Sequence, residues 1–170
     1  MKKTLVEIKA RINGLDVFDE KLRKVANFIG VFHQIDTYFN VNKGRLKLRE
    51  VEGQEYSQLV YYEREDIKDP KRSSVIIAKV IDPYFIKEIL SKVLGIKVIV
   101  EKYRKIYMYK GVQIHLDEVK GLGTFIEFEL NMDERRIEEG KNKLYKLMKE
   151  LGIKRKWLVQ VSYSDLLLNK

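Results

Sequence analysis

Charged side chains recur at every second position in several stretches of this 170-residue chain. Glu7, Lys9 and Arg11 alternate with apolar residues near the N-terminus. Glu127 and Glu129 do the same in the run FIEFEL. Because successive side chains of a β-strand point to opposite faces, each set would share one face of its strand. Carboxylates that converge in this way supply the hard oxygen ligands that Mg2+ and Mn2+ prefer, so the spacing is compatible with a divalent metal site.

Basic residues follow the same spacing and outnumber the acids. Arg45, Lys47 and Arg49 would share one face of the run RLKLREV. Gathered by strand face, the candidate set comprises eight bases and four acids: Lys9, Arg11, Arg45, Lys47, Arg49, Arg64, Lys102, Arg104, Glu7, Asp117, Glu127 and Glu129. Lysines and arginines neutralise phosphate charge, and an arginine can bind two phosphate oxygens at once. Together with a metal ion, these bases indicate a triphosphate site.

A solvated sheet face with incidental ion pairs is the alternative interpretation, because charged and apolar residues alternate in any half-buried sheet. The spacing by itself leaves both interpretations open. An exposed surface usually mixes the two signs of charge more evenly and carries more serine, threonine and glutamine. If the sheet closes into a barrel, its apolar faces can pack under helices while its charged faces point into the lumen.

Three helices and about eight strands are expected to position these residues. The helices cover approximately residues 16–28, 82–95 and 133–152. Their apolar stripes should face the core, and that of the second helix comprises Phe85, Ile86, Ile89, Leu90 and Val93. The strands cover approximately residues 4–12, 34–41, 45–51, 56–64, 74–80, 97–109, 112–119 and 124–131. Strands in such a succession favour an antiparallel sheet or a closed barrel with helices around it, which is an α+β fold.

The composition excludes several classes of protein and site. The chain has no cysteine, which excludes disulfides, thiolate zinc sites and cysteine nucleophiles. Its formal net charge of +9 favours an anionic partner such as a nucleotide, a polyphosphate or a nucleic acid. No apolar run approaches the roughly 20 residues of a membrane span, and the N-terminus lacks the apolar core of a signal peptide. We therefore expect a cytoplasmic protein of one domain without a membrane partner.

Other features receive no chemical role from the sequence. His33 and His115 have no triad-like neighbours, so packed or solvated histidines are the favoured interpretation. Residues 121–123, Gly-Leu-Gly, lack the remainder of a P-loop and predict a tight hairpin. Residues 71–74 follow a proline and predict a solvated loop, and residues 162–165 are assigned no chemistry.

The order of short motifs along the chain carries a family resemblance. The motifs are Glu7-Ile8-Lys9 with Arg11, Gln34-Ile35-Asp36-Thr37-Tyr38-Phe39, Leu46-Lys47-Leu48-Arg49, Tyr62-Glu63-Arg64, Lys102 with Arg104, HLDEVKGLGTFIEFEL and SYSDLL. In this order they resemble the CYTH superfamily. That superfamily is named for a class IV adenylyl cyclase and a thiamine triphosphatase, and its members are also called triphosphate tunnel metalloenzymes.

The resemblance implies that residues 1–170 form one CYTH-like domain, an eight-stranded antiparallel β-barrel with flanking helices. Its tunnel would bind a triphosphate together with Mg2+ or Mn2+. The resemblance matches Glu7, Glu127 and Glu129 to acidic metal positions and the eight bases to phosphate positions. On this basis Glu7, Lys9 and Glu129 are the predicted catalytic residues.

One residue departs from the family pattern. The first glutamate of the family's ExExK signature is Leu5 in this chain. The change removes one metal oxygen and leaves open whether the site holds one metal ion or two. Asp117 is the candidate that would compensate.

Hydrolysis of inorganic triphosphate or of a nucleoside triphosphate is the favoured reaction, because it requires only a bound water. Cyclisation of ATP to cyclic AMP and pyrophosphate is the alternative, and it requires a base and a ribose hydroxyl held in line. A non-catalytic binder of polyanions or nucleic acid is a further alternative, suggested by the net charge. Such a binder needs no convergent glutamates, which argues against nucleic acid as the partner. Homodimer formation stays open.

Overall fold

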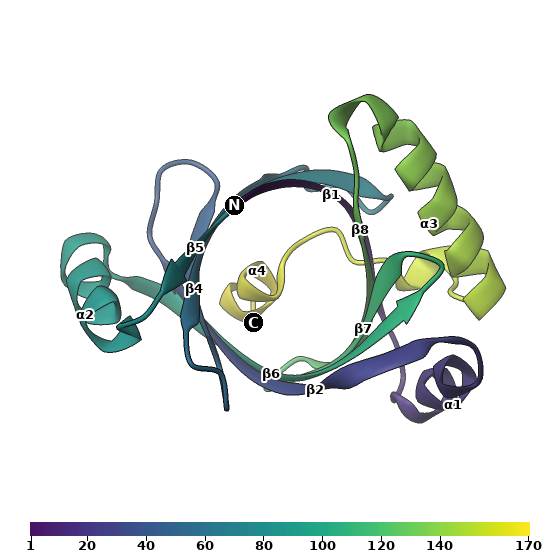
Figure 1. Ribbon diagram of the computed structural model, residues 1–170, viewed down its shortest axis with the longest axis horizontal. Coiled ribbons are helices and arrows are strands. Elements are labelled where there is room, and N and C mark those ends of the chain that lie inside the picture. The colour runs from purple at the N-terminus through teal and green to yellow at the C-terminus, as the bar shows by residue number, and fades with distance from the viewer.

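Eight antiparallel strands form a closed barrel in the computed structural model, which describes residues 1–170 (Figure 1). The strands are β1 (Lys2–Arg11), β2 (Asn27–Phe39), β3 (Arg45–Val51), β4 (Ser57–Arg64), β5 (Lys71–Val80), β6 (Ile96–Tyr109), β7 (Val112–Val119) and β8 (Gly123–Asn131). Their order around the barrel is β1-β5-β4-β3-β2-β6-β7-β8. Most neighbours are consecutive in the chain, as short hairpin connections require. The predicted α+β barrel is confirmed.

Four α-helices surround the barrel or lie across its end: α1 (Asp16–Val25), α2 (Pro83–Leu94), α3 (Ile137–Leu151) and α4 (Tyr163–Leu168). Two short 3-10 turns, η1 (Glu134–Arg136) and η2 (Arg155–Trp157), flank α3. Figure 1 shows α1 and α3 beside β1, β7 and β8, whereas α2 stands on the far side of the barrel. None of the helices is both long and apolar enough to cross a lipid bilayer.

The main core lies between the outer face of the barrel and the helices α1 and α3. Val6, Ile8 and Ala10 point outward from β1 and are at most 2% exposed. They join Leu144 and Leu147 of α3 in one apolar cluster. Full burial of one such aliphatic side chain contributes roughly 1.5–3 kcal/mol. Because alternate residues of β1 are fixed outward by this core, Glu7 and Lys9 are directed into the lumen.

Two predicted boundaries and one predicted loop are wrong. The first helix ends at Val25 rather than at residue 28, and β2 begins at Asn27 rather than at residue 34, because β2 pairs with β6 over almost its whole length. The predicted loop at residues 71–74 is instead the start of β5. Its register places Lys71 opposite Glu7 on β1, so the ladder with β1 extends this strand.

The predicted apolar stripe of α2 faces the core only in part. Phe85 is 58% and Ile89 is 54% exposed, and no residue of α2 is fully buried. Ile86 and Leu90 of the same stripe pack against a small cluster around Phe39, as predicted. A helix that contacts one small cluster cannot bury the whole of a wide apolar stripe.

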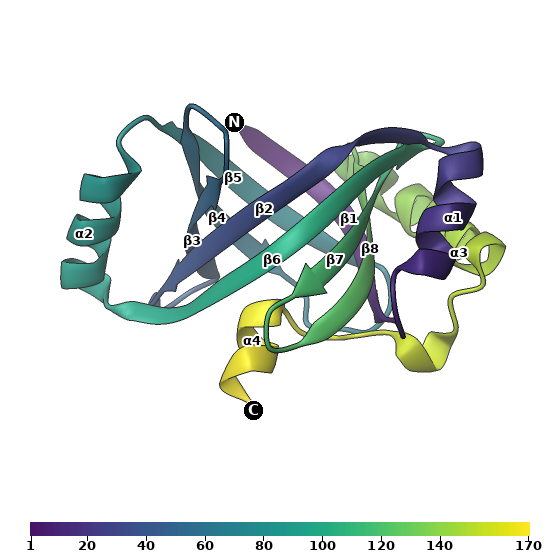
Figure 2. The same cartoon turned by 90° about the horizontal axis from the view of Figure 1, so that it is seen from below.

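The C-terminal helix α4 lies across one end of the barrel. It appears inside the ring of strands in the view of Figure 1 and below the barrel in Figure 2. Ser162 begins the helix with a capping box, in which its side chain and that of Asp165 each accept from the other's backbone N–H. The ring of Tyr163 packs edge-on against Phe125 of β8, with centroids 4.9 Å apart. This end of the lumen is thus filled by side chains of α4 and β8.

Candidate active site in the barrel lumen

The inward-facing side chains line one cavity of about 770 Å³, the open space at its mouth included. Nine of the twelve candidate residues lie in its wall: Glu7, Lys9, Lys47, Arg49, Arg64, Lys102, Arg104, Glu127 and Glu129. The register of β1 and β8 places Glu7 opposite Glu129 and Lys9 opposite Glu127. Period-two alternation explains why residues far apart in the sequence meet here, since each strand turns every second side chain inward.

Asp36 lies at the centre of the largest group of cations. Its carboxylate accepts hydrogen bonds from Lys47 Nζ and Lys102 Nζ, each at 2.9 Å. It also accepts from Arg49 Nε at 2.7 Å and Arg49 Nη2 at 2.8 Å. Burial disfavours the charged carboxylate, but Arg49, Lys102 and Lys47 outweigh it and hold the pKa of Asp36 well below its usual range. Three cations thus share one anion, which leaves positive charge for an anionic ligand.

The two lysines of this group hold their protons weakly. Burial, aided by the positive charge of Arg49, lowers the pKa of Lys47 to about 7 although Asp36 opposes the shift. Burial likewise lowers the pKa of Lys102 to about 8. Both amines are therefore partly deprotonated in the free protein at slightly alkaline pH.

Arg104 is held by a second buried carboxylate. Its Nε and Nη2 atoms donate to the two oxygens of Asp117 at 2.7 and 2.6 Å. Tyr163 of α4 donates to Asp117 Oδ2 at 2.7 Å. Burial favours the neutral acid, but the guanidinium of Arg104 keeps the pKa of Asp117 below its usual range. Asp117 orients Arg104, and both of its oxygens are already engaged.

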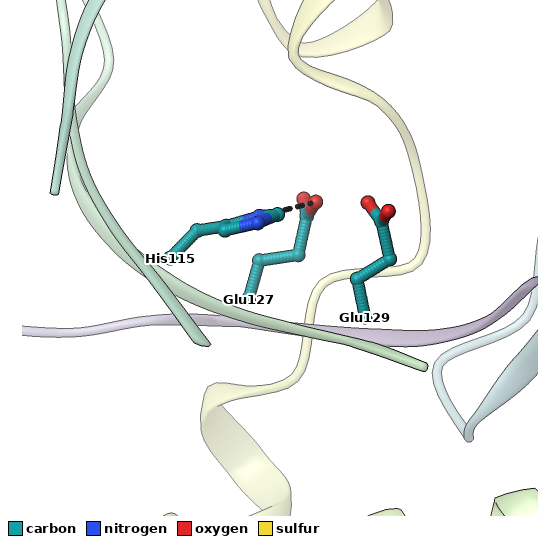
Figure 3. A group of neighbouring side chains, drawn as sticks. All are labelled: His115, Glu127 and Glu129. Carbon is teal, nitrogen blue, oxygen red and sulfur yellow. Dashed lines mark hydrogen bonds and ion pairs between the residues drawn. The ribbon is translucent and has the colours of Figure 1, made fainter. Parts of the chain in front are cut away.

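Glu127 and Glu129 of β8 lack such close partners. Glu129 makes no hydrogen bond or ion pair within the protein, and Figure 3 shows its carboxylate beside that of Glu127. Glu127 is only 8% exposed. Its nearest basic atoms are Lys9 Nζ and His115 Nδ1, both at 3.4 Å, and Arg104 Nη2 at 3.6 Å. These distances exceed the 2.7–2.9 Å or so of a charge-assisted hydrogen bond, so the carboxylate has room to accept a cation.

The carboxylate of Glu127 nevertheless stays ionised. Burial raises the pKa of its carboxyl, but Lys9 and Arg104 outweigh that effect and hold it well below its usual range. Ligand atoms of Glu127, Glu129 and His115 all lie within 4.8 Å of one another. The three side chains are thus close enough together to hold one metal ion.

Glu7 and two unpaired polar atoms complete the wall. Glu7 Oε1 accepts a hydrogen bond from Arg64 Nη1 at 2.8 Å. Arg64 Nε and Ser73 Oγ are buried without a hydrogen-bond partner, and both residues line the cavity. Such atoms are rare in native proteins, so these two are candidates for contact with a ligand.

Arg11 and Arg45 are not brought into the cavity wall, and neither is Asp117. Arg11 is the last residue of β1; its Nη1 atom donates to the carbonyl of Leu122 at 2.6 Å, and its guanidinium lies over the ring of Phe125. Arg45 donates to Asp165 of α4 at 2.8 Å. A position on the inward face of a strand therefore does not by itself place a side chain in the cavity wall. Both arginines lie at the end of the barrel that α4 covers.

Sequence reasoning missed Asp36, His115 and Tyr163 as parts of the site. Asp36 shares the inward face of β2 with Tyr38, and the same alternation that identified Glu7 would have identified it. His115 lies opposite Glu127 in the β7–β8 ladder, a relation that only the register reveals. Tyr163 reaches the lumen from the C-terminal helix, and no local pattern predicts that contact.

An apolar wall lies beside the charged groups. Leu5, Val60, Val75 and Ile77 line the same cavity from β1, β4 and β5. These strands are neighbours, and the β4–β5 register places Val60 opposite Ile77. Leu5 follows Lys3 in the inward row of β1 that ends near α4 at Arg11, so the apolar wall lies toward the other end of this row.

Comparisons with known proteins agree with this architecture. The CYTH domain model matches residues 4–163. The chain is 29% identical to a Methanocaldococcus jannaschii protein named "Putative adenylate cyclase MJ0240", over 95% of this chain and 97% of that protein. The solved structure of the PH1012 protein from Pyrococcus horikoshii aligns with a TM-score of 0.87 at 25% identity, covering 95% of this chain and 98% of that one.

A more distant structure shares the fold. It is that of HpAC1 from Hippeastrum, a protein described as a putative adenylyl cyclase with a dominant triphosphatase activity. The two chains align with a TM-score of 0.66 at 16% identity, over 98% of this chain and 94% of that one.

Proposed function

Because the chain belongs to the CYTH domain family, we propose that it is a divalent-metal-dependent enzyme that hydrolyses a triphosphate inside its barrel. The proposal rests mainly on the two carboxylates without close partners, Glu127 and Glu129, which share the cavity wall with Arg104 and with the cations around Asp36. A non-catalytic binder of polyanions would need the cations alone. The carboxylates therefore favour an enzyme over a binder.

The phosphates would occupy the space between the two groups. Lys47, Arg49 and Lys102 on one side and Arg104 on another would donate hydrogen bonds to the phosphate oxygens, and the planar guanidinium groups would fix their orientation. Glu127 and Glu129 would hold Mg2+ or Mn2+, which neutralises phosphate charge and lowers the pKa of a bound water. Positioning and charge stabilisation supply most of the catalysis in phosphoryl transfer.

The proton movements can be assigned to two residues of this chain. Glu129 accepts no hydrogen bond from the protein, so it is available to take a proton from the attacking water. The water oxygen bonds to phosphorus as the bridging P–O bond breaks. The departing phosphate takes a proton from Lys9, whose pKa is lowered by burial and which lies 3.4 Å from Glu127. Glu7 would keep Arg64 directed at the phosphates.

The apolar wall favours a triphosphate that carries an organic group. Inorganic triphosphate has no apolar surface that could contact Leu5, Val60, Val75 or Ile77, whereas a nucleoside does. A nucleoside triphosphate is therefore the preferred substrate class. The protein would work in the cytoplasm, where such substrates occur. Homodimer formation stays a prediction, and analytical ultracentrifugation would test it.

Cyclisation of ATP is the second candidate reaction. The curated relative bears the name of an adenylate cyclase, and the cavity wall includes Gln58 and the unpaired Ser73 Oγ near the apolar side chains. These polar groups could hold a base or a ribose, which cyclisation requires and hydrolysis does not.

Product analysis separates the two reactions. We expect ATP with Mn2+ or Mg2+ to yield phosphate or pyrophosphate with a linear nucleotide, and inorganic triphosphate to be turned over less efficiently. Chromatography of the nucleotides is the measurement. Cyclic AMP with pyrophosphate as the main products would replace hydrolysis by cyclisation. No turnover, with tight and steeply salt-dependent nucleic-acid binding instead, would favour the binder.

Binding of a triphosphate should take up protons. Lys47 has a pKa of about 7 and Lys102 of about 8 in the free protein, and a nearby polyanion raises both. The complex therefore holds more protons than the free protein, and affinity should fall as the pH rises from about 7 to 9. Calorimetry at pH 8.5 in buffers of different ionisation enthalpy measures the uptake. Lys47→Met should reduce it, and uptake of no protons by the unsubstituted protein would contradict the lysine assignment.

A further inference from the structure

We propose that His115 is a nitrogen ligand of the metal ion and that it makes the site favour Mn2+ and similar transition-metal ions over Mg2+. This inference rests on the proposed metal-dependent function. His115 is 2% exposed, and the β7–β8 register places it directly opposite Glu127. The same register places Gln113 opposite Glu129, so the four side chains form two rows across adjacent strands.

The hydrogen bonding of the imidazole is that of a metal ligand. His115 Nε2 lies 3.2 Å from the amide oxygen of Gln113, which can only accept, so this contact is satisfied by a proton on Nε2. His115 Nδ1 lies 3.4 Å from Glu127 Oε1, a long hydrogen-bond distance. With the ring proton on Nε2, Nδ1 has a lone pair for a metal ion, and a cation held between Nδ1 and Glu127 would replace this long contact. Histidine ligands in proteins typically donate their other N–H to a carbonyl or carboxylate in this way.

The second histidine of the chain provides a contrast. His33 has carboxylates on both sides, Glu52 at 3.1 Å from Nδ1 and Glu101 at 3.1 Å from Nε2. Its ring stacks on Tyr103 with centroids 4.6 Å apart, on a residue that is 53% exposed. Both of its nitrogens are occupied at ordinary hydrogen-bond distances. His33 therefore has carboxylate neighbours, as a metal ligand would, but neither of its ring nitrogens is left for a metal ion.

An imidazole ligand changes which metal ion binds best. Mg2+ demands oxygen ligands in a nearly ideal octahedron, whereas Mn2+ and the later transition metals accept imidazole nitrogen. Leu5 supplies no oxygen to this lumen, which leaves the Glu127–Glu129 pair with fewer carboxylate neighbours. His115 would supply the third protein ligand in their place.

Pulsed electron paramagnetic resonance of bound Mn2+ tests the proposal directly. The probe is Mn2+ alone, and then Mn2+ with a methylene-bridged triphosphate, which resists hydrolysis and contains no nitrogen. We expect a nitrogen coupling from a directly bound imidazole. It should disappear in His115→Gln and persist in His33→Gln, since the chain has only these two histidines. The Kd of Mn2+ should rise tenfold or more in His115→Gln, and that of Mg2+ should change less.

Each other outcome has a definite meaning. Persistence of the nitrogen coupling in His115→Gln, or its loss in His33→Gln, would overturn the proposal. Bound Mn2+ that shows phosphorus but no nitrogen coupling would also overturn it, while leaving a carboxylate metal site and the proposed function intact. Absence of bound Mn2+ under both conditions would overturn the metal site as a whole.

Discussion

Replacement of Glu129 by glutamine should lower metal-dependent triphosphate turnover at least a hundredfold while the fold remains intact. The side chain keeps its size but loses the charge that would hold the metal and accept the proton of water, and losses of about 100- to 1,000-fold are usual for a single electrostatic contact of this kind. Glu129 makes no hydrogen bond or ion pair within the protein, so its removal breaks no stabilising contact. Phosphate release with Mn2+ measures the rate, and the melting temperature should stay within a few degrees.

Glu118→Gln is the matched control. Glu118 lies on the outside of β7 and is exposed, so the same change of charge there should leave turnover unaltered. Turnover that is equal in Glu129→Gln and in the unsubstituted protein would remove Glu129 from the site. Equal losses in both variants would point to net charge instead of a specific carboxylate.

Replacement of Asp36 by asparagine should destabilise the free protein by about 3–5 kcal/mol, because it leaves Lys47, Arg49 and Lys102 buried without their shared anion. For a chain of this length the melting temperature should fall by roughly 10 °C. Inorganic triphosphate, added without metal so that no turnover occurs, competes with Asp36 for the same three cations. It should therefore raise the melting temperature of the variant more than that of the unsubstituted protein. Thermal denaturation with and without the ligand provides both values.

Asp69→Asn serves as the comparison for this prediction. Asp69 pairs with Arg155 at the surface, and exposed ion pairs contribute about 0–1 kcal/mol. A similar small loss in Asp36→Asn would show that the three cations do not depend on Asp36. Equal stabilisation of the variant and the unsubstituted protein by triphosphate would show that the ligand binds elsewhere.

The fold and the charged lining were largely predictable because both depend on a local rule. Alternation of charged and apolar residues in β1, β3, β6 and β8 is visible within a few residues. Once the sheet closes, the alternating charged residues of each strand face the lumen together. Helix starts with a clear cap, such as Asp82 before Pro83, were also predictable. The end of α1 was not predictable, because the residues that follow it pair with β6: Asn27 lies opposite Met108, far away in the sequence.

The roles within the lining were less predictable, because they depend on register. Asp117 and Glu127 have the same local pattern, yet Asp117 is saturated by Arg104 and Tyr163 whereas Glu127 is not. That difference comes from which residues stand opposite each other on adjacent strands. His115 is the same case: its type suggested a packed histidine, and its burial agrees, but its neighbours make it a metal-ligand candidate.

The closure of one barrel end by α4 makes the lumen a blind-ended well. Tyr163, Leu166 and Leu167 pack there with Phe125 and Leu122, and the Arg45–Asp165 ion pair lies beside them, so apolar and paired charged side chains together form the floor. A chain of many phosphates could not be threaded through such a well, and only its terminal units would reach the bottom. Products would also have to depart through the opening by which the substrate arrived, so a deeply seated phosphate would be released last.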